Sequence, residues 1–209
     1  MSAPPEIDPE VRAENRRLLR HLGFGRVPDD LDEVPPPGPL REQGEVLDRA
    51  LALHVVVSVS SGLDADAGQR WLQGLGVDGS LLEDEREYLD DVADGIRVED
   101  AHRATGTEAL AALLWSVGLA ESLPLEGPAA WASTVLPGPD EAVADVLDGA
   151  SLRPVAALVA AWDLAAGMVW ALRADPDLEV GAAPGSLDPY VVRRRHAAFR
   201  WVLGSEEAA

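Results

Sequence analysis

The sequence of 209 residues contains no cysteine and no lysine. Without cysteine, disulfides, thiol catalysis and zinc sites built on thiolates are excluded. Aromatic residues are scarce as well, at 5% of the chain, and six of them are tryptophan. Because one buried aromatic side chain removes roughly 150–250 Å² from water, we expect the tryptophans to anchor the core of a globular protein.

Positive charge is also in short supply. The 17 basic residues, all arginine, face 37 acidic residues, and the net charge is −20. Phosphates and anionic lipid are repelled by such a chain, so we expect no binding to nucleic acid or membrane. The start of the sequence lacks a basic segment followed by an apolar run, which predicts no signal peptide and a cytoplasmic protein. A protein partner with a basic surface suits this charge.

Local motifs for catalysis or metal binding are lacking. No two histidines have the helical spacing of metal ligands, and neither an HExxH sequence nor a Gly-x-Ser-x-Gly sequence occurs. Residues 74–79 have the spacing of a dinucleotide fingerprint, but a predicted helix precedes them where that fingerprint needs a strand. Residues 90–94 match the DDxxD pattern of isoprenoid synthases, yet a solvated helix face is favoured in so acidic a chain. We therefore predict no cofactor, no metal and, on balance, no enzymatic activity.

Apolar residues recur at helical spacing along most of the chain, and strand signals are scarce. Asp8-Pro9 and Asp188-Pro189 have the form of a helix cap followed by the first helical residue. Ser80 with Glu83, and Thr105 with Glu108, have the form of capping boxes. The sequence predicts an all-α protein: a single domain over residues 1–209, with residues 24–40 as a proline-rich connector inside it. About eight helices are expected, over residues 9–22, 41–60, 64–75, 81–94, 108–118, 139–147, 154–174 and 189–203.

Two of these segments, which begin near Glu108 and Pro154, are apolar almost all round and should form the centre of the protein. A further ambiguity concerns residues 51–59, which are rich in β-branched side chains and typical of a strand as well as a helix. Residues 154–172 are long enough to span a bilayer, with Asp163 as their one charged side chain. A central aspartate costs about 2.5–3.5 kcal/mol on insertion, so a buried core helix is favoured.

Asp163 requires a partner, because burying a lone carboxylate is very costly. The one basic cluster of the chain consists of Arg193, Arg194, Arg195 and His196. We expect one of these arginines to pair with Asp163 or Glu108. The alternative is that the cluster binds an anionic ligand or partner.

Five segments in order resemble a bacterial domain-of-unknown-function family, the one numbered 4272. They are Asn15-Arg16-Arg17-Leu18-Leu19 with Leu22-Gly23, residues 45–53, Glu108-Ala109-Leu110 with residues 113–118, Asp163 with Trp170-Ala171, and Val191-Val192 with Arg195-His196-Ala197 and Trp201. Three positions depart from the family pattern: Thr105 replaces a tryptophan, Arg194 a glutamate and Arg200 an asparagine. The chain is thus identified as a divergent member, and the resemblance implies no established activity.

Two functional hypotheses follow. The first is a non-enzymatic accessory or protein-interaction domain. The second is a small-molecule or enzymatic pocket built from central polar and aromatic residues. The residues predicted for this pocket, or for a buried ion-pair network in its place, are Glu108, Trp115, Asp163, Trp170, Arg195, His196 and Trp201.

Overall fold

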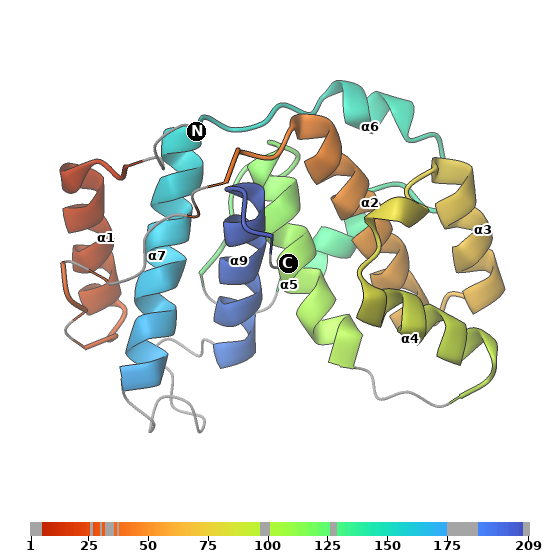
Figure 1. The fold of residues 1–209 in the computed structure, drawn as a ribbon, viewed down its shortest axis with the longest axis horizontal. Coiled ribbons are helices and arrows are strands. Elements are labelled where there is room, and N and C mark those ends of the chain that lie inside the picture. Colours follow the sequence, from red (N-terminus) through yellow and green to blue (C-terminus); the bar gives the residue numbers. More distant parts are fainter. Residues whose placement is uncertain are drawn as a thin grey trace. The chain divides into compact units, whose positions relative to one another are not determined.

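The computed structural model describes residues 6–25, 27–29, 31, 36, 38–96, 101–125, 129–174 and 188–206. These residues contain eight α-helices, two short 3₁₀ helices and no strand (Figure 1). The predicted all-α class is therefore confirmed. Residues 51–59, for which a strand was the alternative, are helical.

The chain divides into two compact units, and each is described here by itself. Unit 1 comprises residues 1–41, 124–128 and 153–209; unit 2 comprises residues 42–123 and 129–152. The prediction of a single domain over residues 1–209 stays a prediction. Of the predicted connector, residues 26, 30, 32–35 and 37 lie outside the described residues.

The helices of unit 1 are α1 (Pro9–His21), α7 (Val155–Ala174) and α9 (Pro189–Val202). Asp8 caps α1 by accepting the Glu10 amide at 2.8 Å, and Asp188 caps α9 by accepting the Tyr190 amide at 2.8 Å. Both predicted Asp-Pro starts are confirmed. Proline suits the first helical position because its ring fixes φ and it has no amide N–H that would lack a partner there.

Unit 2 contains five described helices or helical turns before residue 117 and two after it. They are α2 (Gln43–Ser60), α3 (Ala65–Leu75), η1 (Asp78–Ser80), α4 (Glu83–Ala93), α5 (Ala101–Ser116), η2 (Ala130–Thr134) and α6 (Ala144–Asp148). Asp64 caps α3 by accepting the Ala67 amide at 3.0 Å, and Gly76 ends it with a left-handed φ of 71°. Of the glycines in residues 74–79, Gly74 lies inside α3, Gly76 ends it and Gly79 lies in η1. A helix, and not a strand, therefore precedes Gly76, as the favoured interpretation expected.

Three predicted helix starts are wrong. The Leu82 amide, not that of Ser80, is bound at the start of α4, where it donates to the Glu85 carboxylate at 3.0 Å. The Thr105–Glu108 pattern lies inside α5, which begins at Ala101, and α6 begins at Ala144 and not at Pro139. A capping pattern is local, and alanines ahead of it are strong helix formers that can carry the helix further back.

In unit 1, α7 lies between α1 and α9 and packs against both (Figure 1). Its buried residues include Leu158, Trp162, Met168 and Leu172. This helix is long and apolar enough to cross a membrane by length and composition alone. However, 61% of its most apolar stretch of 18 residues is buried inside the protein. Burial against α1 and α9 is what a core helix requires.

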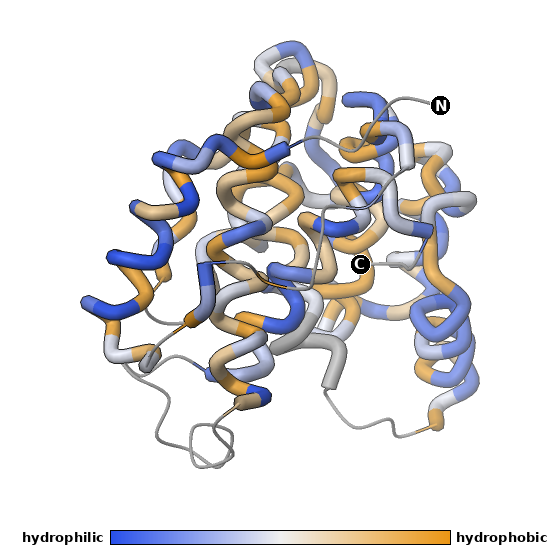
Figure 2. The backbone as a smooth tube through the Cα atoms, turned by 60° about the vertical axis from the view of Figure 1, so that its left-hand side comes forward, coloured by the Kyte–Doolittle hydropathy of each residue, from blue (hydrophilic) through white to orange (hydrophobic). Residues whose placement is uncertain are grey.

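In unit 2, α5 packs against α2 more extensively than against any other described element. Leu110, Leu113 and Leu114 of α5 are fully buried. A Cβ atom on Gly106 would lie 2.9 Å from Val57 Cγ2, so the glycine allows the two helices to approach closely. Hydrophobic and hydrophilic residues alternate along much of the backbone (Figure 2). Helices α1, α3 and α4 are amphipathic, whereas α2 is buried over most of its surface. Both helices predicted to be central are thus buried, each within its own unit.

Candidate functional site

The carboxylate of Asp163 is buried in unit 1, at 1% exposure, and its partners come from α1. Arg16 Nη1 donates to Oδ2 and Arg16 Nη2 to Oδ1, both at 3.1 Å. Asn15 Nδ2 also donates to Oδ2 at 3.0 Å, and Arg12 Nε lies 3.3 Å from Oδ1. Both carboxylate oxygens therefore have charged or polar donors, which offset the cost of desolvating the aspartate.

The fit of α1 onto α7 depends on Gly167. A Cβ atom at this position would lie 2.5 Å from Leu19 Cδ1 and 3.1 Å from Arg16 Nη1. The guanidinium of Arg16 is further held by its Nε, which donates to the Pro28 carbonyl at 2.8 Å. The glycine thus leaves the space that brings Arg16 down to Asp163.

The predicted pairing of Asp163 with the Arg193–Arg195 cluster is wrong, and the alternative pairing of this cluster with Glu108 stays a prediction. Arg195 is buried, but its Nη1 donates to the Pro124 carbonyl at 2.5 Å. The carboxylate of Asp163 points toward α1. On that helix Arg12, Asn15 and Arg16 share one face with the buried Leu19. That spacing of i, i+3, i+4 and i+7 was the signal in the sequence, because polar residues on the inward face of a helix need buried partners.

The other residues predicted for unit 1 have separate surroundings. His196 is buried and its ring stacks on Trp162, with 6.3 Å between centroids and 28° between planes. The Trp201 ring lies under the Arg41 guanidinium, 5.0 Å from its centroid, in a cation–π contact. Trp170 is exposed at 37%. His196 and Trp201 therefore pack against other side chains of the unit, Trp170 does not, and none of the three has a described contact with Asp163.

Glu108 and Trp115 belong to α5 of unit 2. Glu108 is 1% exposed, and its Oε1 accepts the Ala129 amide at 2.5 Å, at the start of η2. Trp115 is half-buried. Glu108 therefore joins the chain after residue 128 to the central helix of the unit.

Sequence reasoning missed a second buried ion pair, between Arg49 of α2 and Glu85 of α4. Arg49 Nη1 donates to Oε2 at 2.8 Å and Nη2 to Oε1 at 2.7 Å. The two side chains are 2% and 6% exposed. The spacing of Glu85, Tyr88 and Leu89 on one face of α4 could have indicated that this glutamate points inward.

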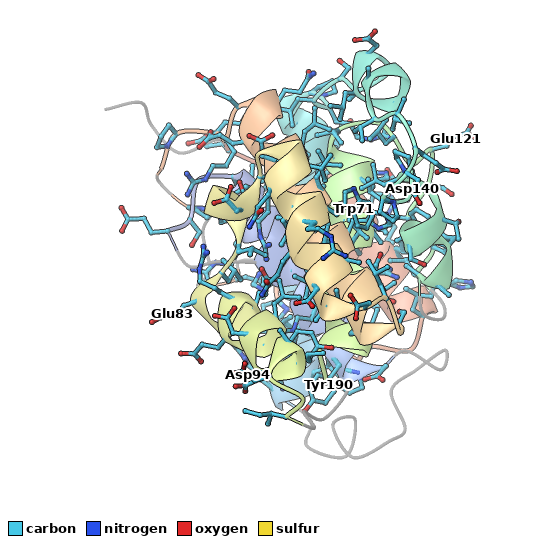
Figure 3. All side chains as sticks on the ribbon, turned by 90° about the vertical axis from the view of Figure 1, so that its right-hand side faces the viewer. Trp71, Glu83, Asp94, Glu121, Asp140 and Tyr190 are labelled. Carbon is cyan, nitrogen blue, oxygen red and sulfur yellow. The ribbon has the colours of Figure 1, made fainter. Side chains whose placement is uncertain are left out.

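The outward face of α4 carries negative charge, and we call it the α4 acidic surface. Its exposed members are Glu83, Asp84, Glu87, Asp90 and Asp94, and Asp91 is half-buried. Figure 3 shows Glu83 and Asp94 at the two ends of this helix. No described hydrogen bond or ion pair involves the side-chain carboxylates of Glu83, Glu87, Asp91 and Asp94. Their charges are free to act on another molecule.

A cleft of about 250 Å³ runs beside this surface, between α3 and α4. Its polar lining consists of Gln69, Gln73, Asp78, Arg86 and Asp90. Leu72, Leu81 and Leu89 supply its apolar lining. The described residues contain no group of three or more histidines, cysteines or carboxylates placed to hold a metal ion. In the DDxxD pattern, Asp90 and Asp94 are exposed and Asp91 is half-buried.

None of the seven residues predicted for a pocket lines this cleft or a second cleft in unit 2. Asp163, Glu108 and Arg195 are instead engaged by backbone or side-chain groups of the protein itself. Their described contacts hold helices and loops together, and a pocket built from the seven residues stays a prediction.

Comparison with known proteins places the chain in one family. The family described as "Domain of unknown function (DUF4272)" matches residues 12–209, nearly the whole chain. No curated protein and no solved structure matches.

Proposed function

The chain belongs to the DUF4272 family, and on that premise we propose that it is a non-enzymatic accessory protein that binds a partner with a basic surface through the α4 acidic surface. The observation that carries the proposal is the row of unpaired carboxylates along α4. Like charges held on one face repel each other, and a cationic partner relieves that repulsion.

The way α4 is attached supports this proposal. The Arg49–Glu85 pair and the buried Tyr88 and Leu89 hold its inner face against the unit. The carboxylates on the outer face are therefore presented from a rigid helix and not from a loop. A rigid array loses little conformational freedom on binding, which favours affinity.

The cleft between α3 and α4 offers an anchor for such a partner. Asp78 and Asp90 line it together with the apolar Leu72 and Leu89. An arginine or lysine of the partner has an apolar stem and a cationic tip, so it suits walls of this composition. Buried arginines are frequent among the few residues that dominate binding energy.

The experiment is a capture from source lysate at low and high salt, with retained proteins identified by mass spectrometry. We expect basic proteins to be retained at low salt and released at high salt, because salt screens exposed charges. A variant that neutralises four of the six carboxylates of this surface should no longer retain these proteins: Glu87→Gln, Asp90→Asn, Asp91→Asn and Asp94→Asn.

The matched control removes the same number of charges from exposed positions of unit 1: Glu6→Gln, Glu10→Gln, Glu14→Gln and Glu206→Gln. This control should retain the same proteins as the original chain. The proposal fails if nothing is retained at low salt, or if both variants lose binding equally. The second outcome would mean that net charge alone, and not the α4 surface, is recognised.

A further inference from the structure

A second cleft in unit 2 has a chemistry unlike that of the α4 acidic surface. It has a volume of about 550 Å³ and lies between α3 and residues 139–143. Small-molecule sites commonly have volumes of about 300–1,000 Å³. The α3 residues that line it, among them Ala67, Arg70, Trp71 and Gly74, lie on a different face of the helix from Gln69, Leu72 and Gln73 of the first cleft.

The apolar wall of this cleft, which we call the Trp71 cleft, includes Trp71, Leu63, Leu75 and Val143. The ring of His54 in α2 packs edge-on against Trp71, with 5.2 Å between the ring centroids and 79° between the ring planes. The indole is 7% exposed, and its N–H makes no hydrogen bond among the described residues. The indole nitrogen is not among the fully buried nitrogens that lack a partner, so this donor keeps contact with solvent and is available to a ligand.

The same cleft carries charges of both signs. Arg70 and Asp140 both line it, both are exposed, and neither forms an ion pair or hydrogen bond among the described residues. Figure 3 shows Asp140 next to Trp71. Glu141 has a different role, because its Oε2 accepts the Gly138 amide at 2.8 Å and so shapes the turn that presents Asp140.

We propose that the Trp71 cleft binds a small zwitterion of the α-amino-acid type with an apolar side chain. The ligand carboxylate would accept from the Arg70 guanidinium and the Trp71 N–H, and its ammonium would donate to Asp140. Its side chain would lie against the apolar wall, where burial adds affinity. A ligand with charge of one sign would satisfy one of these groups and be repelled by the other.

To test this, the full chain is titrated with four probes, and binding is measured by calorimetry and by changes in amide chemical shifts. The probes are L-leucine, L-phenylalanine, L-leucine amide, which lacks the carboxylate, and N-acetyl-L-leucine, which lacks the ammonium. Titration to about 10 mM covers weak ligands with Kd near 1 mM. We expect the two free amino acids to bind at least about tenfold more tightly than either derivative, since each derivative loses one charge-assisted contact.

Variants identify the groups that act on each end of the ligand. Arg70→Gln should remove the preference for L-leucine over L-leucine amide. Asp140→Asn should remove the preference over N-acetyl-L-leucine. Trp71→Phe keeps the apolar wall but removes the donor, and should weaken the binding of L-leucine. Arg70 and Asp140 are exposed, so the folding of their variants, checked by melting curves, should be unchanged.

The controls are Arg86→Gln and Asp90→Asn, which make the same chemical changes in the cleft between α3 and α4. They should leave amino-acid binding unchanged. The proposal is overturned if no probe binds up to about 10 mM, or if the controls and the Trp71-cleft variants have equal effects. Neither result bears on partner binding through the α4 acidic surface, which uses other residues.

Discussion

Arg16 and Asp163 are 147 positions apart in the chain, yet their side chains form two parallel hydrogen bonds in a nearly dry environment. Both side chains are 1% exposed. Such a pair adds little net stability compared with apolar residues of similar shape, but removing one partner leaves the other as a buried, uncompensated charge. The pair therefore specifies how α1 lies on α7 more than it stabilises the fold.

The first prediction concerns Asp163→Ala. This change leaves the Arg16 guanidinium buried without its carboxylate, and we expect the free energy of unfolding to fall by about 3–5 kcal/mol. Urea denaturation followed by circular dichroism measures the effect. Asp94→Ala removes an exposed carboxylate and should change stability by no more than about 0.5 kcal/mol. An unaltered unfolding midpoint for Asp163→Ala would contradict the buried pair.

The second prediction concerns Arg49 and Glu85, whose side chains pair in unit 2. Arg49→Met or Glu85→Leu alone should each cost about 3–5 kcal/mol, because the remaining charge stays buried. The double variant removes both charges and should recover most of this loss. A double-mutant cycle on urea denaturation gives the coupling, and strictly additive losses would show that the two charges do not interact.

The third prediction concerns Gly167→Ala. The new methyl group would overlap Leu19 Cδ1, which is fully buried and has little room to move. We expect the free energy of unfolding to fall by about 1–3 kcal/mol through overpacking between α1 and α7. Gly44→Ala is the matched control, since no atom lies within 4 Å of the new Cβ there. The control should be neutral or slightly stabilising, and equal effects at both positions would refute the close approach of α1.

The fourth prediction concerns the pH dependence of stability. Burial lowers the pKa of His54 below its ordinary value of 6.5. When the pH falls through about 6.5, the unfolded chain takes up a proton on this histidine while the folded chain does not. The unfolded state then binds more protons than the folded state. The free energy of unfolding therefore declines as the pH falls from about 6.5 to the pKa of His54 in the folded state, and above about pH 6.5 it does not depend on this histidine.

Unfolding free energies between about pH 7.5 and 5 measure this dependence. His54→Phe keeps an edge-on aromatic contact with Trp71 and should flatten the profile in this range. His21→Gln changes an exposed histidine and should leave the profile as it is. A profile that is equally steep with phenylalanine at position 54 would assign the pH dependence to other groups.

Helix positions were largely predictable because their signals are local. An aspartate before a proline marks the starts of α1 and α9, and left-handed glycines follow several helix ends. Where local signals were ambiguous, prediction failed, as at the start of α5. The alanines ahead of Thr105 allow the helix to begin at Ala101, and no local pattern reports how far back a helix extends.

The predicted site depended on contacts that are not local. Burial and pairing of Asp163 followed from its apolar surroundings, but its partner did not. Two arginine-bearing helices, α1 and α9, both pack against α7, and the direction in which Asp163 leaves the helix selects α1. The Arg49–Glu85 pair was missed for the same reason, because it is not a local contact. In a segment with many acidic residues, the sequence does not distinguish Glu85 from its exposed neighbours.

By itself the sequence determined that this protein is helical and acidic, where most of its helices lie, and which carboxylate must be paired. Propensity, capping and charge act over a few residues, so they can be read along the chain. The tertiary structure alone decided which arginine meets Asp163, which acid of α4 turns inward, and which residues surround the Trp71 cleft. These depend on how helices pack between residues that lie 36 to 147 positions apart, where a residue without a side chain, such as Gly167, sets how closely two helices approach.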